Sequence, residues 1–145
     1  MRRAIPHLQR EAGFSLIELL VVVLVIGILA GIALPIFLDQ RRDAQDADAK
    51  SNARNMAGQL ESCYVTSGAF DAPACLPPET TGLPVGVAPG KVGVEAPGAE
   101  RYVITARSRS GTAFVIERKV DGDRERTCTR PGVGGCADLG GRGVW

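Results

Sequence analysis

The sequence has 145 residues, 45% of them hydrophobic, and its 17 basic side chains nearly balance its 16 acidic ones. This length leaves room for one small domain once the apolar N-terminal region is set aside, and it excludes a multidomain protein. The only histidine, His7, lies close to the N-terminus. If the residues before the apolar run are removed, the remaining chain has no imidazole, which argues against most enzymes.

An apolar run without a single charged side chain extends over residues 19–38. At about 1.5 Å per residue, a helix of this length matches the roughly 30 Å hydrocarbon core of a bilayer. The preceding segment carries Arg2, Arg3 and Arg10 against Glu11. By the positive-inside rule, we expect one membrane-spanning helix with a cytoplasmic N-terminus and with residues 39 onward outside.

The helix is expected to continue beyond the apolar run. Small and apolar side chains recur there at three- to four-residue steps, at Ala49, Ala53, Met56, Leu60 and then Cys63 or Tyr64. This spacing is typical of an amphipathic helix with a narrow apolar stripe. Pro35 is expected to kink the helix without ending it, because the helical pattern continues on both sides. We therefore predict one helix over about residues 14–65, with a membrane half at 14–38 and an amphipathic half at 39–65.

Residues 66–100 are crowded with glycine and proline and show no sustained period, so we expect a long surface loop with a short strand around 91–95. From Arg101 the period becomes two, which predicts strands at RYVITARS and AFVIERKV. A third strand, RERTCTR, follows the turn signal Asp121-Gly122. Residues 101–145 are thus predicted to form an antiparallel β-meander and a glycine-rich C-terminal loop.

The predicted fold class is α+β, with the long helix packed on the small antiparallel meander. The inner face of the sheet, which would receive the helix stripe, is predicted to consist of Tyr102, Ile104, Phe114 and Ile116. Two loops flank this core, and cysteines lie beside both.

Four cysteines, Cys63, Cys75, Cys128 and Cys136, all follow the predicted membrane helix, on the side where oxidation is permitted. Four cysteines allow three pairings. We prefer Cys63 with Cys75 and Cys128 with Cys136, because each pair ties down a neighbouring loop rich in glycine or proline. A zinc site would need reduced thiolates, and no CxxC spacing is present. We therefore expect two disulfides, no metal and no cofactor.

The stretch Gly13-Phe14-Ser15-Leu16-Ile17-Glu18, between a short basic segment and the apolar run, closely resembles the N-terminus of type IV pilins. Pseudopilins are the nearest relatives of that family. The resemblance implies a leader of the class III type over residues 1–13, cut after Gly13 by a membrane-embedded prepilin peptidase that also methylates Phe14. It implies an assembly role for Glu18. It covers residues 1–38 strongly, whereas the remainder shares only the order of helix, loop and meander.

Elementary electrostatics give the acid at Glu18 a reason. A carboxylate at membrane depth costs about 2.5–3.5 kcal/mol, so it needs a partner. Cleavage after Gly13 creates one, the α-amino group of Phe14. Within one helix this amine lies a turn away from Glu18, at an end where it does not neutralise the carboxylate well. A neighbouring subunit that is staggered along a filament brings its own amine beside Glu18. That pair would set the register, since any other stagger leaves both charges buried and unpaired.

Gly27, Gly31 and Pro35 divide the membrane half of the helix. Glycine weakens a helix by about 1 kcal/mol and proline by about 3 kcal/mol. Filaments of the family that the chain resembles often have a loosened helix in this segment, which implies local flexibility once the helix leaves lipid. The alternative is that such residues are simply common in membrane helices.

The predicted function is that of a structural, non-catalytic subunit of a type IV pilus-like filament, membrane-anchored before assembly and part of an extracellular filament afterwards. The expected partners are other pilin subunits, the prepilin peptidase and methyltransferase, the assembly platform and membrane lipid. The alternatives are a pseudopilin of a type II secretion system and a membrane-anchored binding or adhesion domain. An ordinary secretory signal cut near residues 31–33 is disfavoured, because such signals do not begin their apolar region with an acid.

Basic residues are in excess from Arg101 onward, which suggests weak binding of DNA or another polyanion. Acidic residues are interleaved with them, and no nucleic-acid motif is present. A solvated sheet edge, or contact with the acidic residues 39–48 of a neighbour, is therefore the preferred interpretation.

Overall fold

The computed structural model describes residues 13–72, 74–75 and 82–145. The chain divides into two compact units, Met1–Phe37 and Leu38–Trp145. In its described part, the first unit is the apolar beginning of a helix. The second unit contains the rest of that helix and a six-stranded sheet. The leader expected at residues 1–13 lies outside the described residues except for Gly13.

Helix α1 (Leu16–Ser67) has 52 residues and contains Pro35 without ending there, as the sequence predicts. It begins after Ser15, whose carbonyl accepts hydrogen bonds from the N–H groups of Glu18 (3.1 Å) and Leu19 (3.2 Å). It ends at Gly68, whose positive φ of 74° suits the left-handed conformation that closes many helices. The Gly68 N–H donates to the Tyr64 carbonyl at 2.8 Å.

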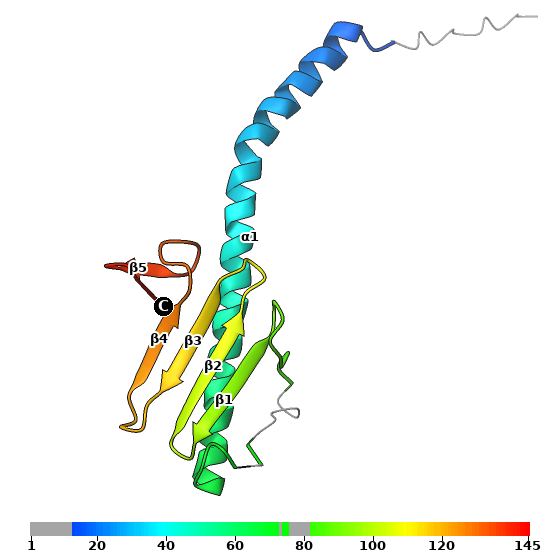
Figure 1. Ribbon diagram of the computed structural model, residues 1–145. Coiled ribbons are helices and arrows are strands. Elements are labelled where there is room, and N and C mark those ends of the chain that lie inside the picture. Colours follow the sequence, from blue (N-terminus) through cyan, green and yellow to red (C-terminus); the bar gives the residue numbers. More distant parts are fainter. Residues whose placement is uncertain (1–12, 73, 76–81) are drawn as a thin grey trace, which may run out of the picture. The chain divides into compact units, whose positions relative to one another are not determined.

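Six antiparallel strands form one sheet in the order β1-β2-β3-β4-β6-β5 (Figure 1). The strands are β1 (Val92–Gly98), β2 (Arg101–Arg107), β3 (Ala113–Arg118), β4 (Arg124–Cys128), β5 (Ala137–Leu139) and β6 (Arg142–Val144). The three strands predicted from Arg101 onward are β2, β3 and β4, and the short strand expected near residues 91–95 is β1. The predicted α+β class is therefore confirmed.

The prediction of a loop for the C-terminal tail is wrong, because β5 and β6 form a short hairpin there. Leu139 pairs with Arg142 across Gly140 and Gly141, and both glycines have positive φ, 64° and 85°. Two such residues make the tight turn that matches the twist of a hairpin. Strand β6 then pairs with β4 through Thr127 and Val144, so the sheet is not a simple meander.

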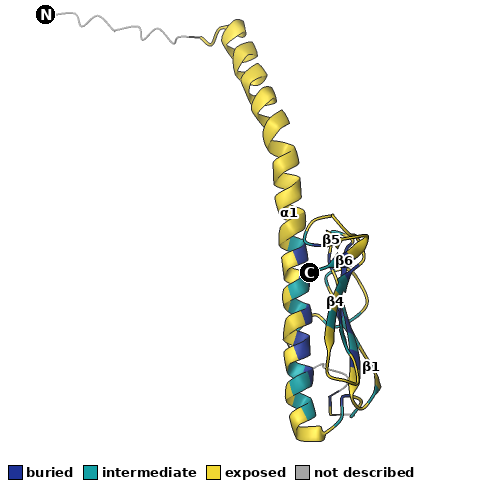
Figure 2. Cartoon of the chain, turned by 90° about the vertical axis from the view of Figure 1, so that its left-hand side faces the viewer, coloured by how far each residue is buried: buried dark blue, intermediate teal, exposed yellow. Residues whose placement is uncertain are grey.

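The core lies between the amphipathic half of α1 and one face of the sheet. Ala49, Ala53, Met56 and Leu60 are all buried on the helix, as the apolar stripe predicts. The expected inner face of the sheet is confirmed, since the four side chains proposed for it are at most 2% exposed. Figure 2 shows the buried stripe of α1 turned toward the strands. Alanines in the stripe let the helix backbone approach the sheet closely, and Phe70 and Val92 complete the core.

A buried carboxylate fastens the first turns of this helical half to the sheet. Asp46, which is 1% exposed, accepts hydrogen bonds from the Ser110 hydroxyl (2.5 Å) and the Gly135 N–H (3.0 Å). One turn further on, Lys50 donates to the Gly135 carbonyl, and its ammonium lies 5.1 Å from the centroid of the Phe114 ring. The sequence analysis includes Asp46 among the acidic residues 39–48 offered for contact with a neighbour, whereas the structure buries it within the chain, three residues before Ala49 on the buried stripe.

A second polar cluster fastens the end of the helix. The Glu61 carboxylate accepts from the Tyr102 hydroxyl (3.1 Å) and forms ion pairs with Arg118 (3.3 Å) and Arg124 (3.3 Å). Burial, followed by the nearby Glu61 carboxylate, raises the pKa of Tyr102 to about 12. The Arg118 guanidinium also lies 4.8 Å from the centroid of the Phe70 ring. This cluster crosses between α1, β2, β3 and β4.

Two disulfides close the segments that carry little regular structure. Cys63 is bonded to Cys75, and Cys128 to Cys136, the same partners that the sequence analysis prefers. Near the second bond, the Trp145 indole N–H donates to the carbonyls of Thr127 (2.9 Å) and Val115 (3.3 Å). The C-terminal hairpin is thereby held against β3 and β4.

Replacing Tyr102 with Phe tests the Glu61 cluster. The loss of a hydrogen bond to a carboxylate should lower the free energy of unfolding by about 1–3 kcal/mol near neutral pH. In the parent chain the folded state favours the neutral phenol, so this stabilisation is complete below the usual pKa of 10.0 and is lost as the pH rises from 10 toward 12. The variant should show a shallower alkaline decline. Denaturant unfolding in micelles, followed by near-ultraviolet circular dichroism, measures both quantities.

Tyr64→Phe is the matched control, because it also removes one phenol hydroxyl but leaves the contact with Glu61 in place. An equal alkaline decline in the parent and Tyr102→Phe chains would contradict the assignment.

Removing either disulfide tests the role of the two closed segments. Loops of this size contribute on the order of 3 kcal/mol by the chain-entropy model. The double variants Cys63→Ser/Cys75→Ser and Cys128→Ser/Cys136→Ser should each become protease-sensitive, with the first cuts near the broken bond. Non-reducing peptide mapping of the parent chain checks the pairing itself, and a peptide joining Cys63 to Cys128 or Cys136 would refute it.

Candidate functional site

The described beginning of the first unit exposes an apolar surface on every side of the helix. Exposed fractions of the large apolar side chains run from 82% at Leu16 to 44% at Leu38, and none of the side chains in residues 14–38 is buried. Figure 2 shows this part of α1 as uniformly exposed. A helix that is apolar all round is typical of a membrane span or of the centre of a helix bundle. This chain provides no cover for it among the residues that the structure describes.

By length and composition, α1 is able to cross a membrane. Its most apolar window of 18 residues has a mean hydropathy of 3.1, and no part of that window is buried. Signal sequences and the core helices of soluble proteins pass the same test of composition. The absence of burial sets this helix apart from a core helix, and its continuation to Ser67 sets it apart from a short signal segment.

Glu18 lies in the first turn of the helix and is exposed, as is Phe14 just before the helix begins. The N–H of Glu18 donates to the Ser15 carbonyl. Ser15 and Glu18 have the spacing of a capping box, and an acid in the first turn is favoured by the helix dipole. The structure therefore supplies a local reason for an acid at this place, which the sequence analysis did not consider. Among the described residues, no basic side chain forms an ion pair with Glu18.

The residues expected to give the helix flexibility lie within continuous α-helix. A Cβ atom added at Gly27 or Gly31 would meet no atom of another segment within 4 Å. These glycines are therefore not required by packing inside this chain, and they form open patches one turn apart on the same face. Local loosening around Pro35 in a filament stays a prediction.

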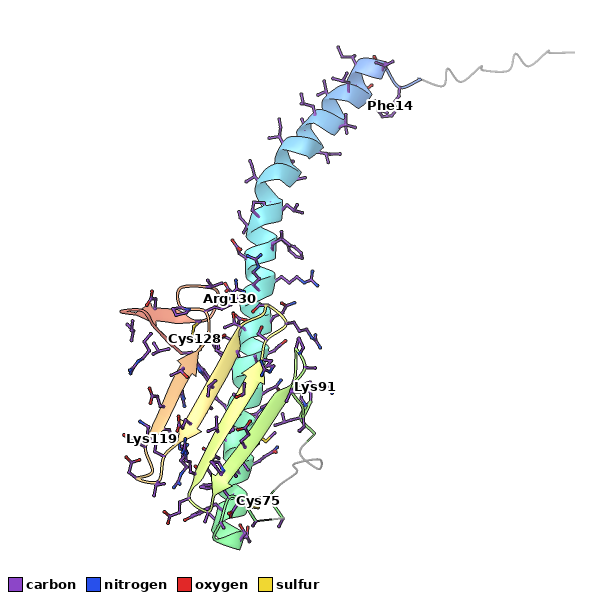
Figure 3. The ribbon with its side chains drawn as sticks, in the orientation of Figure 1. Phe14, Cys75, Lys91, Lys119, Cys128 and Arg130 are labelled. Atoms are coloured by element: carbon purple, nitrogen blue, oxygen red, sulfur yellow. A yellow bond between two sulfur atoms is a disulfide. The ribbon has the colours of Figure 1, made fainter. Side chains whose placement is uncertain are left out.

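The expected disulfide residues lie far along the sequence from this helix surface and belong to the second unit. Figure 3 labels Phe14 in the first unit and Cys75 and Cys128 in the second. Among the residues described, no group of three or more His, Cys, Asp or Glu side chains is arranged to hold a metal ion. The candidate site is thus the surface of residues 13–38 rather than a pocket.

The N-terminal residues match a known family model, the prokaryotic N-terminal methylation motif, over residues 8–34. Among curated proteins, the chain is similar to the fimbrial protein EcpC of Eikenella corrodens, with 39% identity over 44% of this chain and 42% of the relative. It is also similar to the type IV major pilin protein PilA of Myxococcus xanthus, with 47% identity over 31% of this chain and 20% of the relative. No solved structure matched the chain.

A further relative is the type IV major pilin protein PilE1 of Neisseria gonorrhoeae, which is 36% identical over 40% of this chain and 35% of the relative. In each case the alignment spans less than half the length of the curated relative. The family model itself covers only residues 8–34 of this chain. The methylation motif and the similarity to several pilins support a relationship of this chain to the type IV pilin family, and the long N-terminal helix packed on an antiparallel sheet is consistent with the fold of that family.

Proposed function

We propose that the chain is a structural subunit of a type IV pilus-like filament. The observation that carries this proposal is the exposed apolar surface of residues 14–38, which overlaps the methylation motif matched over residues 8–34. Lipid covers this surface before assembly, and the same surface on other subunits covers it afterwards. The family is one of structural subunits, so we assign no catalytic activity.

Processing is the first step of this proposal. A prepilin peptidase cuts between Gly13 and Phe14 and methylates the new N-terminus. Residues 13–15 precede the helix and are exposed, so they lie outside helical structure that a protease would have to unwind. A Cβ atom at Gly13 would meet no other atom within 4 Å, so this chain tolerates a larger residue there. A requirement for a small residue at Gly13 therefore belongs to the peptidase.

Registration in the filament is the second step. The carboxylate of Glu18 pairs with the Phe14 amine of a neighbouring subunit, since cleavage leaves that amine at the apolar end of the helix and Glu18 forms no ion pair with another described residue. Helix packing supplies most of the apolar contact, and it is not selective for one stagger. The charge pair is selective, because a displaced neighbour leaves an acid and an amine buried without compensation.

Topology follows the charges that flank the helix. The basic residues before Gly13 favour a cytoplasmic N-terminus, and the disulfide-bonded second unit is suited to the oxidising side. Before assembly the chain is a single-pass membrane protein, and after assembly it is part of an extracellular filament. The assembly platform in the membrane is the partner that moves it from one state to the other.

The first functional prediction is that the mature chain begins at methylated Phe14. Intact-mass spectrometry of the extracted protein measures the start and the added methyl group. Gly13→Leu should leave the precursor uncut, whereas Gly31→Leu, a matched change in open helix surface, should be processed normally. A mature start at Met1 or Leu34 would contradict the proposal.

The second functional prediction concerns the charge of Glu18. Glu18→Ala should leave processing, membrane insertion and both disulfides intact, because it makes an exposed apolar helix more apolar. Filament yield per processed subunit should fall at least tenfold, since an unpaired buried ammonium costs several kcal/mol. Glu18→Gln should be nearly as defective, and Glu18→Asp should recover part of the yield. Shearing and electron microscopy, normalised to processed subunit, give the measurement.

Ser15→Ala separates this role from helix capping, because it weakens the capping box but keeps the acid. It should assemble with near-normal yield. If Ser15→Ala fails while Glu18→Gln assembles normally, Glu18 acts through the helix start and the proposed intersubunit pair is wrong.

A further inference from the structure

The two ends of the sheet carry opposite exposed charges. We define the basic end as Lys91, Arg107, Arg109 and Arg130, and the acidic end as Asp71, Glu100, Asp121 and Asp123. All eight side chains are exposed. The two groups lie at opposite ends of the strands within the second unit, so the question is whether each is compensated by its surroundings.

Strand register places the basic end. Val92 pairs with Ala106, and Arg107 pairs with Ala113, so the start of β1, the end of β2 and the β2–β3 turn lie together. The Arg130 guanidinium donates to the Ser110 carbonyl at 3.2 Å, which adds the segment after β4. Figure 3 labels Lys91 and Arg130 at this end of the sheet.

The same register places the acidic end. Gly98 pairs with Arg101 around the β1–β2 turn that holds Glu100, and Arg118 pairs with Arg124 around the turn that holds Asp121 and Asp123. Asp71 joins them because the N–H of the preceding residue, Phe70, donates to the Ala99 carbonyl at 2.8 Å.

Ion pairing compensates the charges of the two ends only in part. Near the acidic end, Arg118 and Arg124 share the single carboxylate of Glu61, Arg101 pairs with Glu117, and Lys119 pairs with Glu125 while also interacting electrostatically with Asp121. None of the eight residues that define the two ends forms an ion pair with another described residue. What remains is positive at one end of the strands and negative at the other.

A groove of about 240 Å³ borders the basic end. It is lined by Arg107 at the end of β2, by Arg109 in the β2–β3 turn, by Gln45, Asp48 and Asn52 of α1 and by Pro84. The Arg109 side chain lies against Gly90, where an added Cβ would come within 2.9 Å of its Nε. One acid, Asp48, lines the groove beside the two arginines. The other charges on this part of α1 balance, since Arg41, Arg42 and Lys50 are matched in number by Asp39, Asp43 and the buried Asp46.

We infer that the basic end of one copy binds the acidic end of a second copy, head to tail. A two-fold contact through either end would place like charges against each other, which disfavours it. A contact between two different surfaces repeats in one direction and generates an open helical assembly when its rotation does not close. The inference rests on the proposed filament, and it assigns a polar contact between the second units in addition to the contact between helices.

Reversing one charge at each end, first singly and then in combination, tests this inference in the full-length chain. Arg109→Glu and Asp123→Lys should each lower the filament yield per processed subunit roughly tenfold, because each brings like charges together. The combined variant should recover most of the yield. The matched control combines Arg109→Glu with Glu95→Lys, which restores the net charge at an exposed acid in β1 away from both turns. This control should stay defective.

A second measurement does not depend on filaments. Sedimentation of the full-length chain in uncharged micelles should show self-association at low salt, and high salt should weaken it. Either single charge reversal should abolish this self-association, and the combined variant should restore it. If Glu18→Gln blocks filaments while neither measurement responds to Arg109→Glu, this inference is wrong and the proposed function stands. If the processed parent forms no filaments, the proposed function fails and sedimentation decides the inference.

Two other results would overturn the inference. In the first, Arg109→Glu and Asp123→Lys are each defective and the combined variant does not recover the yield, which would show that the two ends do not meet. Salt-sensitive binding of double-stranded DNA or heparin that is lost in Arg109→Glu, with normal filaments and normal sedimentation, would assign the basic end to a polyanion instead.

Discussion

The apolar surface of residues 14–38 is the constraint on which the rest of the molecule depends. Burying such a surface is the largest favourable term available to the chain, and the described residues offer nothing to bury it against. The second unit does not depend on this surface, because it has its own core, its own disulfides and the hydrogen bonds and ion pairs of Asp46 and Glu61. In the proposed filament, such a chain folds first and associates afterwards, because its association surface takes no part in the folding of the second unit.

The amphipathic half of α1, unlike the apolar half, packs against the sheet of the same chain. It has to stay attached to a sheet through a narrow stripe that is largely alanine, which buries little area per residue. The small side chains bury little apolar area, and hydrogen bonds and ion pairs of Asp46 and Glu61, near the two ends of the stripe, add further attachment of the helix to the sheet. They also fix the register of the helix on the sheet, since a shift by one turn would separate a buried carboxylate from its donors.

Much of this architecture is visible in the sequence because it is periodic. The helix, the strands from Arg101 to Cys128, the inner face of the sheet and the motif around Phe14 all follow from repeats or short signals. The hairpin at residues 137–144 is not predicted because its strands are only three residues long and lie in a glycine-rich segment, although Gly140-Gly141 is a turn signal. Asp46 and the separation of charge between the two ends were not predictable, because they depend on which turns the fold brings together.

The contact between Asp46 and Gly135 links the Cys128–Cys136 bond to the docking of the helix. Gly135 immediately precedes Cys136, so its N–H group is presented to Asp46 by the loop that the bond to Cys128 closes. Without that bond the loop has more conformations available, and holding the Gly135 N–H against Asp46 costs more conformational entropy. Because such coupling is reciprocal, oxidation of the two thiols and docking of the helix on the sheet favour each other.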